Sequence, residues 1–260
     1  MSLLTSSSAP HPRWHRLTVR AVSHPVPGSA EITLDVPDGL AADFLRYDAG
    51  QYLTLRAVVD GQRVAQSYSI TVPPHEARAA GALTVAASEV PGGRMSPWLV
   101  HGVATGESLE VLPPMGDFRC DRVDGPGGRH VAVAGGSGIT PVLAVVGHVL
   151  HADPDAHVRV VLSHRGPDTA LGLEALRRRG EEHPGRLEVV PVWSRAAPQG
   201  ERVMGRLDAA ALADLAADDA DDWWLCGPDG LVRGTRDWLL TRGADADHVH
   251  TEVFFSDEPM

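Results

Sequence analysis

The pattern of apolar and polar positions divides the chain into two parts. From residue 13 to about 118, polar and apolar residues alternate in short runs: WHRLTVRAVSH, AEITLDVP, QYLTLRAVVDGQRVAQSYSITV and GALTVAASEV. A period of two is typical of β-strands with one buried face. Strands this close together, without helical spacers, predict an antiparallel barrel or sandwich. Asp60-Gly61 predicts a hairpin turn, and SPWLVHG predicts a short helix over 96–101 with Ser96 as its cap.

From about residue 128 the pattern changes to strands that alternate with helices. The apolar runs are HVAVAGG, VRVVLSHR, RLEVVPVWS, DDWWLCGP and HVHTEVFF, and segments of helical length separate them. This alternation predicts a doubly wound parallel sheet. The Gly/Pro-rich stretch 124–129 is the expected boundary. We therefore expect a disordered tail over 1–12, an antiparallel β-barrel over 13–123 and an α/β domain over 124–260. The acidic run 217–222 is interpreted as a solvated loop.

Composition and charge narrow the function. A length of 260 residues suffices for two ordinary domains. The net charge of −11 argues against nucleic acid and anionic membrane surfaces, because both need a basic face. Cys120 and Cys226 form no CxxC pair, so we expect no iron–sulfur cluster and no metal site. A reduced cytoplasmic protein is the simpler interpretation, with a disulfide as the alternative. The sequence predicts neither a membrane helix nor a signal peptide.

The turn GGSGITP at 135–141 carries the first candidate chemistry. Gly135, Gly136 and Gly138 allow backbone angles and close contacts that a Cβ would block. Thr140 is expected to cap the following helix and Pro141 to occupy its first position. N–H groups and the helix dipole bind anions at such a turn, and the expected anion is a nucleotide pyrophosphate. The turn is no P-loop, and Pro141 replaces the last glycine of GxGxxG. Close helix–sheet packing without a ligand is therefore the alternative.

Six motifs in order give a family resemblance. They are QSYSI at 66–70, GGRMSPWL at 92–99, PPMGDF at 113–118, GGSGITP at 135–141, LCGP at 225–228 and EVFF at 252–255. Together they resemble the ferredoxin–NADP reductase superfamily, most closely the flavin reductase modules of flavohaemoglobins, phenylacetyl-CoA epoxidase reductases and ring-oxygenase reductases. The resemblance covers nearly the whole chain after the tail. It implies a six-stranded antiparallel flavin-binding barrel followed by a nicotinamide-binding α/β domain.

The resemblance implies that the first part binds FAD rather than FMN. Tyr68 would pack against the isoalloxazine, and Ser69, followed by Ile70, would lie near the N5 atom that receives a hydride. A cross-strand aromatic is the alternative interpretation of Tyr68. The loop that holds the flavin pyrophosphate would comprise Gly92, Gly93, Arg94, Met95 and Ser96.

The sequence departs from the family at Gln66, where the family has an arginine that faces the flavin phosphate. Charge-assisted hydrogen bonds are about twice as strong as neutral ones. We therefore expect lower flavin affinity unless Arg63 or Arg94 compensates.

In the second part, the resemblance assigns nucleotide contacts to Gly136, Gly138, Thr140 and Pro141. The Cys226-Gly227-Pro228 turn would lie near the nicotinamide C4 atom, and Glu252 and Phe254 near the flavin edge. The alternatives are a buried apolar cysteine and an exposed acid on a last strand. Arg165 ends the second apolar run, where no acidic residue stands, and this favours NADPH over NADH.

These features imply an FAD-dependent oxidoreductase in which Ser69, Cys226 and Glu252 are the catalytic residues. Hydride would pass from NAD(P)H to the flavin, and electrons would then leave to a separate protein, either a ferredoxin or an oxygenase component. The sequence contains neither the iron–sulfur domain nor the globin of longer relatives, so a separate acceptor is expected. A small-molecule acceptor, such as a quinone, free flavin or dye, is one alternative. A non-catalytic nucleotide-binding subunit or sensor is another, because of Gln66. The oligomeric state is left open, with a monomer as the simplest expectation.

Overall fold

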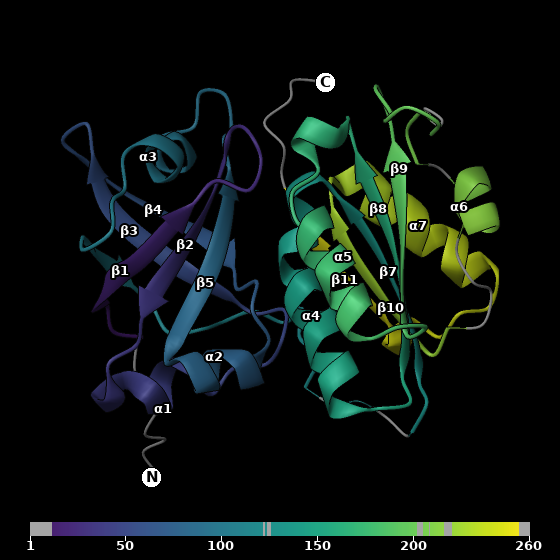
Figure 1. The fold of residues 1–260 in the computed structure, drawn as a ribbon, viewed down its shortest axis with the longest axis horizontal. Helices are drawn as coiled ribbons and strands as arrows, with labels where there is room; N and C mark the ends of the chain where they lie inside the picture. The colour runs from purple at the N-terminus through teal and green to yellow at the C-terminus, as the bar shows by residue number, and fades with distance from the viewer. Residues whose placement is uncertain are drawn as a thin grey trace, which may run out of the picture.

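The computed structural model describes residues 12–121, 123, 126–201, 205–207, 209–215 and 220–254. These residues form two halves, each built on one sheet (Figure 1). The predicted tail, apart from residue 12, and positions 124 and 125 of the expected boundary lie outside the described residues.

The first half is a six-stranded antiparallel sheet with the strand order β4-β3-β6-β1-β2-β5. Its strands are β1 (His15–Ser23), β2 (Ser29–Asp35), β3 (Tyr52–Val59), β4 (Gln62–Ser69), β5 (Ala82–Ser88) and β6 (Ser108–Val111). The sheet curls into a half-barrel whose edge strands are β4 and β5. Only just after β4 do the two edges meet, where Ile70 bridges Val85 and the Thr71 amide donates to the Thr84 carbonyl at 2.9 Å. The predicted antiparallel barrel is therefore confirmed.

Local sequence explains the β3–β4 hairpin. Asp60 and Gly61 have φ angles of 50° and 73°, and Val59 pairs with Gln62 on either side of them. Positive φ at both central residues is the type I′ geometry that Asp-Gly favours, because it matches the strand twist. The predicted hairpin turn is confirmed.

Three short α-helices accompany the half-barrel: α1 (Ala41–Phe44), α2 (Pro74–Ala80) and α3 (Met95–His101), with a 3₁₀ turn η1 (Asp38–Leu40) before α1. Helix α3 contacts β2, β3, β4 and β5. The predicted cap of this helix is wrong. Arg94 takes the cap position, and the Ser96 hydroxyl instead accepts a hydrogen bond from the Val90 amide at 3.1 Å. Ser96 therefore fastens the preceding loop.

The second half is a five-stranded parallel sheet with the order β11-β10-β7-β8-β9. Its strands are β7 (Arg129–Gly135), β8 (His157–His164), β9 (Leu187–Trp193), β10 (Asp222–Gly227) and β11 (Val249–Val253). Its helices are α4 (Ile139–Ala152), α5 (Leu173–Glu182), α6 (Ala209–Leu215) and α7 (Asp229–Thr241), with 3₁₀ turns η2 (Gly136–Gly138), η3 (Pro167–Thr169) and η4 (Ala246–His248). Each predicted apolar run covers one of these strands to within one residue.

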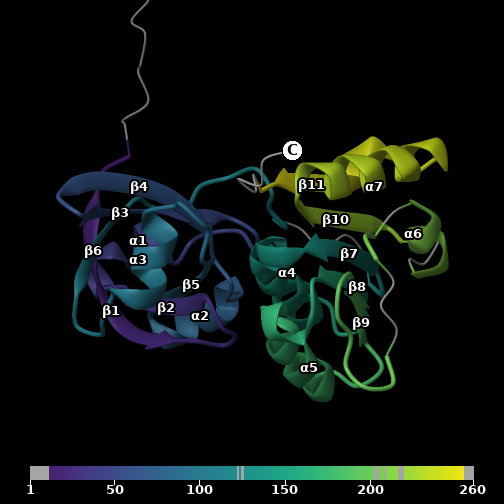
Figure 2. The same ribbon diagram turned by 90° about the horizontal axis from the view of Figure 1, so that it is seen from above.

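Helices cover both faces of the parallel sheet, as a doubly wound fold requires. One face packs its apolar residues against α4 and α5, and the other packs against α6 and α7. The apolar cluster on the α4 and α5 face, here called the first apolar cluster, also includes Ala49, Ala86 and Phe118 of the half-barrel. The two halves therefore share buried surface. Figure 2 shows, from above, that α2 of the half-barrel faces α4 and α5.

The acidic run 217–222 is not entirely a solvated loop. Positions 217–219 lie outside the described residues, but Asp222 belongs to β10 and its side chain is only 14% exposed. Its carboxylate accepts hydrogen bonds from His248 and His250, each at 3.1 Å. These partners offset the cost of burying the carboxylate.

Three further observations concern the described residues only. No helix among them is long and apolar enough to cross a membrane. No group of three or more His, Cys, Asp or Glu side chains among them is placed to hold a metal ion. No disulfide joins Cys120 and Cys226, and both side chains are buried.

Candidate functional site

The parallel sheet has one topological switch point, and it lies between β7 and β10. The chain runs from β7 outward to β8 and β9, then crosses back to the other side of β7 for β10 and β11. In such sheets ligands bind in the crevice outside the carboxyl ends of the strands at the switch point. Here those ends are Gly135 and Gly227, and the word crevice denotes this edge of the sheet, made by the 135–141 and 226–228 turns.

Glycines line this crevice because backbone meets backbone there. A Cβ on Gly138 would overlap the Cys226 carbonyl oxygen and lie 2.6 Å from the Gly227 Cα. Gly227 has φ +145°, and a Cβ on it would lie 2.9 Å from the Gly135 carbonyl oxygen. Gly136 has φ +55°, and no other atom lies within 4 Å of its missing Cβ. The turn is thus exposed at Gly136 and packed tightly against β10 at Gly138. We call residues 135–138 the glycine cradle.

The start of α4 differs from the prediction. The helix begins at Ile139, one residue before the expected cap, because η2 already turns the chain into it. Thr140 lies inside the first turn, is 2% exposed, and donates its hydroxyl to the Ser137 carbonyl at 2.9 Å. Pro141 is also buried in that turn, beyond the first helical position. The Thr140 hydroxyl therefore holds the glycine turn through the Ser137 carbonyl and does not cap the helix.

Cys226 and Glu252 face each other at the carboxyl ends of β10 and β11. They are register partners, and the buried Cys226 thiol donates to a Glu252 carboxyl oxygen at 3.9 Å. Burial raises the pKa of the Cys226 thiol far above its usual range, and the nearby Glu252 carboxyl raises it further. Burial also raises the pKa of Glu252 to about 7, although the thiol hydrogen bond lowers it. The site thus holds a neutral thiol beside a carboxyl that exchanges a proton near neutral pH.

The end of the chain is tied to the same crevice. The Phe254 amide donates to the Gly227 carbonyl at 2.8 Å, and the Phe254 side chain packs against the first apolar cluster. The Cys226–Pro228 turn is therefore held from both sides, by the glycine turn and by the segment after β11.

The candidate residues of the half-barrel line its open edge. Gln66 and Tyr68 of β4 pair with Leu55 and Leu53 of β3, whose side chains are fully buried. Partners in register share a face, so Gln66 and Tyr68 lie on the inner face of an edge strand. Tyr68 packs against the core, and burial raises its pKa; Gln66 is exposed.

Alternation along β4 also decides between the two candidate cations. Arg63 is an odd number of residues from Gln66, so it lies on the opposite face of the strand. Arg94 is exposed in the loop before α3, which contacts β4. Arg63 is therefore poorly placed to compensate for Gln66, and Arg94 remains the candidate.

Buried and turn residues complete this edge. Ser69 is 3% exposed and Ile70 is fully buried. In the loop before α3, Gly92 adopts φ +78° and the Gly93 amide donates to the Val90 carbonyl at 2.9 Å. Met95 begins α3 with its side chain buried. The loop therefore has a fixed conformation beside the open edge of the sheet.

The two sets of residues lie in different halves, which meet through buried aromatic contact. The Phe118 ring packs edge-on against the Trp224 ring, with centroids 5.7 Å apart. The structure gathers the 135–141 turn, Cys226–Pro228, Glu252 and Phe254 in the crevice. It gathers Gln66, Tyr68 and the 92–96 loop at the half-barrel opening.

Sequence reasoning missed one neighbour of Arg165. Arg165 follows β8 and is exposed, and the Arg195 amide, just after β9, donates to the Arg165 carbonyl at 2.9 Å. Two arginines thus stand side by side at the carboxyl edge that also carries the glycine turn. The Ser-Arg pair that ends the third apolar run was the signal available.

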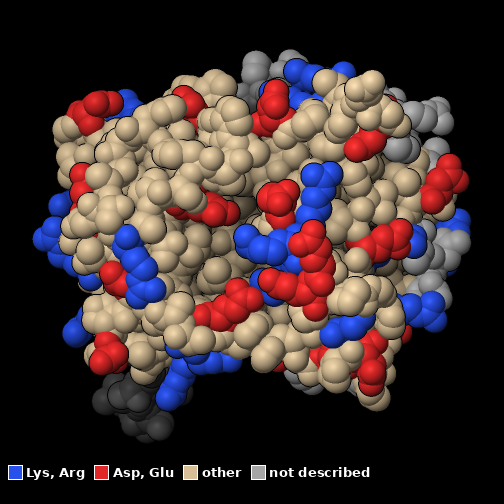
Figure 3. Space-filling view, viewed as in Figure 1, with Lys and Arg blue, Asp and Glu red and all other residues tan. Residues whose placement is uncertain are grey.

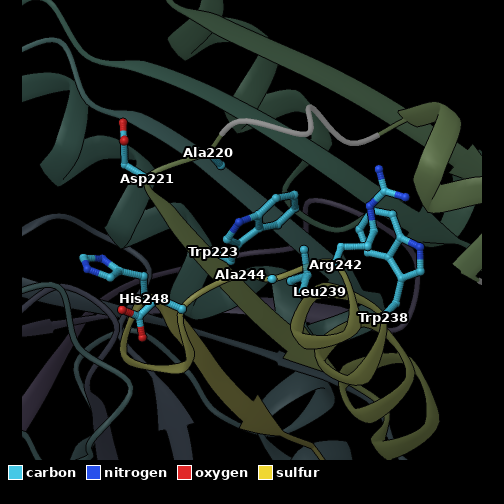
Figure 4. Close-up of a pocket in the computed structure, with 10 residues that line it drawn as sticks. Ala220, Asp221, Trp223, Trp238, Leu239, Arg242, Ala244 and His248 are labelled. Carbon is cyan, nitrogen blue, oxygen red and sulfur yellow. The ribbon is translucent and has the colours of Figure 1, made fainter.

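A cavity of about 440 Å³ lies elsewhere, at the amino-terminal end of β10 (Figure 4). Trp223, Trp238, Arg242 and His248 are among the residues that line it. It is at the opposite end of β10 from the Cys226–Pro228 turn, so it is separate from the crevice.

A half-barrel followed by a doubly wound sheet, with a glycine cradle at the switch point, defines a two-part dinucleotide-binding protein. Comparisons with known proteins agree. Residues 29–120 match the oxidoreductase FAD-binding domain, and residues 132–237 match the oxidoreductase NAD-binding domain.

Individual relatives share this organisation. The ferredoxin reductase component of 3-ketosteroid-9-alpha-monooxygenase from Rhodococcus rhodochrous is 34% identical, over 97% of this chain and 69% of its own. One of the subunits of 1,2-phenylacetyl-CoA epoxidase from Escherichia coli K12 is 29% identical, over 93% and 68%. The crystal structure of an Amycolatopsis cytochrome P450 reductase superposes with a TM-score of 0.77 at 28% identity, over 94% and 71%. The chain belongs to the FAD- and NAD-binding oxidoreductases of the ferredoxin–NADP reductase superfamily, and spans about two thirds of these relatives.

Proposed function

We propose that the chain takes a hydride from NAD(P)H through FAD and passes electrons to a separate acceptor protein, either a ferredoxin or an oxygenase component. The observation that carries this proposal is Gly136 at the switch point, which is exposed, has φ +55° and has open space where a Cβ would stand. When bound, FAD would accept two electrons from the nicotinamide and release them singly.

The residues present fit both groups. Gly136 is open to solvent at the amino-terminal end of α4, where amide groups and the helix dipole favour a pyrophosphate. In the half-barrel, Tyr68 offers a partly buried aromatic ring, and α3, which follows directly on the loop 92–96, contacts the strand that carries it. Gln66 gives one neutral hydrogen bond, so Arg94 is the group proposed to neutralise a flavin phosphate.

The chain's own catalytic residues would control protons and water. Glu252 is proposed to hold a proton at its carboxyl below about pH 7, which keeps negative charge away from the reacting rings. Cys226 presents a buried, neutral thiol that excludes water from the same point. Ser69 is proposed to donate its hydroxyl at the end of β4. The domain boundaries proposed for these roles are 13–123 and 124–260.

Arg165 and Arg195 are proposed to set the nucleotide preference together. A 2′-phosphate carries negative charge that guanidinium groups match in a fork geometry, and NADH lacks this phosphate. The proximity of the two backbones at 2.9 Å supports a joint site. NADPH is therefore the proposed donor.

The acceptor is proposed from the relatives' names. The Rhodococcus relative is a ferredoxin reductase component of a monooxygenase, and relatives from Amycolatopsis and Chromohalobacter are reductase subunits of an O-demethylase and a glycine betaine monooxygenase. This supports a protein acceptor over a quinone, free flavin or dye. We further propose that the protein acts in the cytoplasm. We also propose that it is a monomer, and analytical ultracentrifugation measures this oligomeric state.

The test is reduction of cytochrome c by NADPH, with and without a plant-type ferredoxin. The proposal expects the added ferredoxin to raise the rate severalfold. Equal rates with and without it, alongside rapid dye reduction, would favour the small-molecule alternative. Nucleotide binding without any oxidation would favour the sensor.

A further inference from the structure

The junction of α2, α4 and α5 lies outside the set of candidate site residues, and its contacts suggest a separate role. Helix α2 belongs to the half-barrel, whereas α4 and α5 belong to the other half, and Figures 1 and 2 both show them facing each other. The imidazole rings of His75 on α2 and His151 on α4 stack across this junction, with centroids 3.6 Å apart and planes 8° from parallel. The stack therefore joins one half to the other.

We infer that His75 and His151 are positioning residues, whose stacked rings hold the two halves at the angle that nicotinamide-to-flavin transfer requires and release it in acid. The inference rests on the proposed function only for its link to hydride transfer. The contact itself is a property of the structure.

The backbone is built to bring α2 this close. Gly147 lies in the middle of α4, and a Cβ there would stand 2.9 Å from the Pro73 ring and 3.0 Å from the Arg179 guanidinium carbon. A side chain at this position would push α2 and α5 away. The glycine costs helix stability, and here the close approach explains it.

An ion pair fastens the same junction. Arg179 of α5 donates to a Glu76 carboxyl oxygen of α2 at 2.8 Å, and the Arg179 side chain is only 20% exposed. The His75 Nε2 atom is 3.8 Å from the same Glu76 oxygen, while its buried Nδ1 atom has no hydrogen-bond partner. Glu76 is thus shared with Arg179, which limits its ability to stabilise a charged His75.

The groups that face the stack are mostly basic. His75 faces Glu76 on its own helix, His148 and His151 on α4, and Arg179 on α5. His151 also faces His183, directly after α5, and His183 in turn lies near Arg179, Glu182 and Arg186. Asp48 faces His148 and pairs with Arg119 at 3.6 Å.

Protonation of this cluster is therefore unfavourable in the closed arrangement. Burial, and then the neighbouring His151, lower the pKa of His75 from its ordinary value of 6.5. Burial likewise lowers the pKa of His148 and of His183. Because these bases bind protons more weakly when closed, the closed arrangement is favoured at high pH and weakens as pH falls below about 6.5. A protonated His75 would meet the positive charge of Arg179 across the junction.

The experiment follows hydrogen exchange of α2 amides in the full chain from pH 5 to 8, corrected for intrinsic exchange. We expect the opening equilibrium at 74–80 to rise below pH 6.5 by up to about tenfold per pH unit for each proton taken up. His75→Phe keeps an aromatic stack without a titrating group and should weaken this rise, leaving only the part that His148 and His183 contribute. His101→Phe, an exposed histidine on α3 paired with Glu89, is the matched control and should leave it intact.

A second arm measures the single-turnover rate of flavin reduction at saturating NADPH over the same range. An acid decline that His75→Phe reduces, with nucleotide affinity unchanged, supports the positioning role. Wild-type exchange at 74–80 that does not depend on pH, or an identical decline in His75→Phe, overturns it. Absence of flavin reduction at every pH would overturn the proposed function, whereas the exchange arm would still decide whether the junction is a proton-sensitive clamp.

Discussion

At the scale of single residues, the crevice depends on atoms that are missing. Gly138→Ala would place a methyl group into the Cys226 carbonyl. Forced overlap of this kind costs about 1–3 kcal/mol of unfolding free energy, and we also expect weaker nucleotide binding. Urea unfolding followed by circular dichroism measures the first effect. Gly230→Ala in α7, where nothing lies within 4 Å, is the control and should be neutral or stabilising. Equal stability of the two variants would contradict the close-contact account.

Glu252 gives a pH-dependent prediction. Its pKa rises from an ordinary 4.5 to about 7 in the folded protein, so folding favours its protonated form. Its contribution to stability is complete below pH 4.5 and is lost as pH rises through 7. Glu252→Gln mimics the protonated form at every pH. The difference in unfolding free energy between this variant and the native protein should therefore move in favour of the variant by about 2 kcal/mol between pH 5 and pH 8. Denaturant titrations at both pH values measure this; a pH-independent difference would refute it.

Arg165 and Arg195 give a prediction on specificity. Replacing either arginine by alanine should lower kcat/KM for NADPH by about tenfold or more, because a charge-assisted phosphate contact is lost. The value for NADH should change little. Initial rates with both donors give the ratio, and Arg233→Ala, on the exposed surface of α7, is the control. An unchanged NADPH/NADH ratio in both variants would remove the joint site.

At the scale of elements, the loop before α3 is the part of the half-barrel most sensitive to one hydroxyl. Ser96→Ala removes the acceptor of the Val90 amide and leaves that donor unsatisfied, at a cost of about 1–3 kcal/mol. We expect faster flavin loss during gel filtration, with the circular dichroism spectrum of the half-barrel unchanged. Flavin retention equal to that of the native protein would show that the loop does not hold the cofactor.

Element positions follow from the sequence where local signals and packing agree. Periodicity located the strands of the parallel sheet. In the half-barrel, Asp60-Gly61 predicted the β3–β4 hairpin, because the dihedral angles of the turn itself decide its type. The helix starts failed for a tertiary reason. Thr140 and Ser96 have the chemistry of capping residues, but η2 and the Val90 loop use their hydroxyls for other bonds.

Contacts between distant segments were beyond sequence reasoning. The Arg165–Arg195 contact joins two loops, and the His75–His151 stack joins two halves. Neither leaves a periodic trace in the chain. The family resemblance assigned Cys226 and Glu252 to the place where nicotinamide and flavin would meet, and the structure makes the two residues register partners.

At the scale of the whole molecule, the surface charge bears on which partner the protein can meet. On the face seen in Figure 3, acidic and basic side chains are interspersed and gather near the junction of the two halves. The net charge of −11 is compatible with a partner that carries a basic patch. The FAD-binding and NAD-binding domain matches lie in different halves. Electron transfer from nicotinamide to flavin therefore needs both halves together.

The most direct measurement is the visible absorption spectrum of the purified protein before and after anaerobic addition of NADPH. The account predicts a yellow protein with about one FAD per chain, whose flavin absorption bleaches when NADPH is added. A colourless protein that cannot be reconstituted with FAD, or a yellow one that NADPH leaves unbleached, would contradict it.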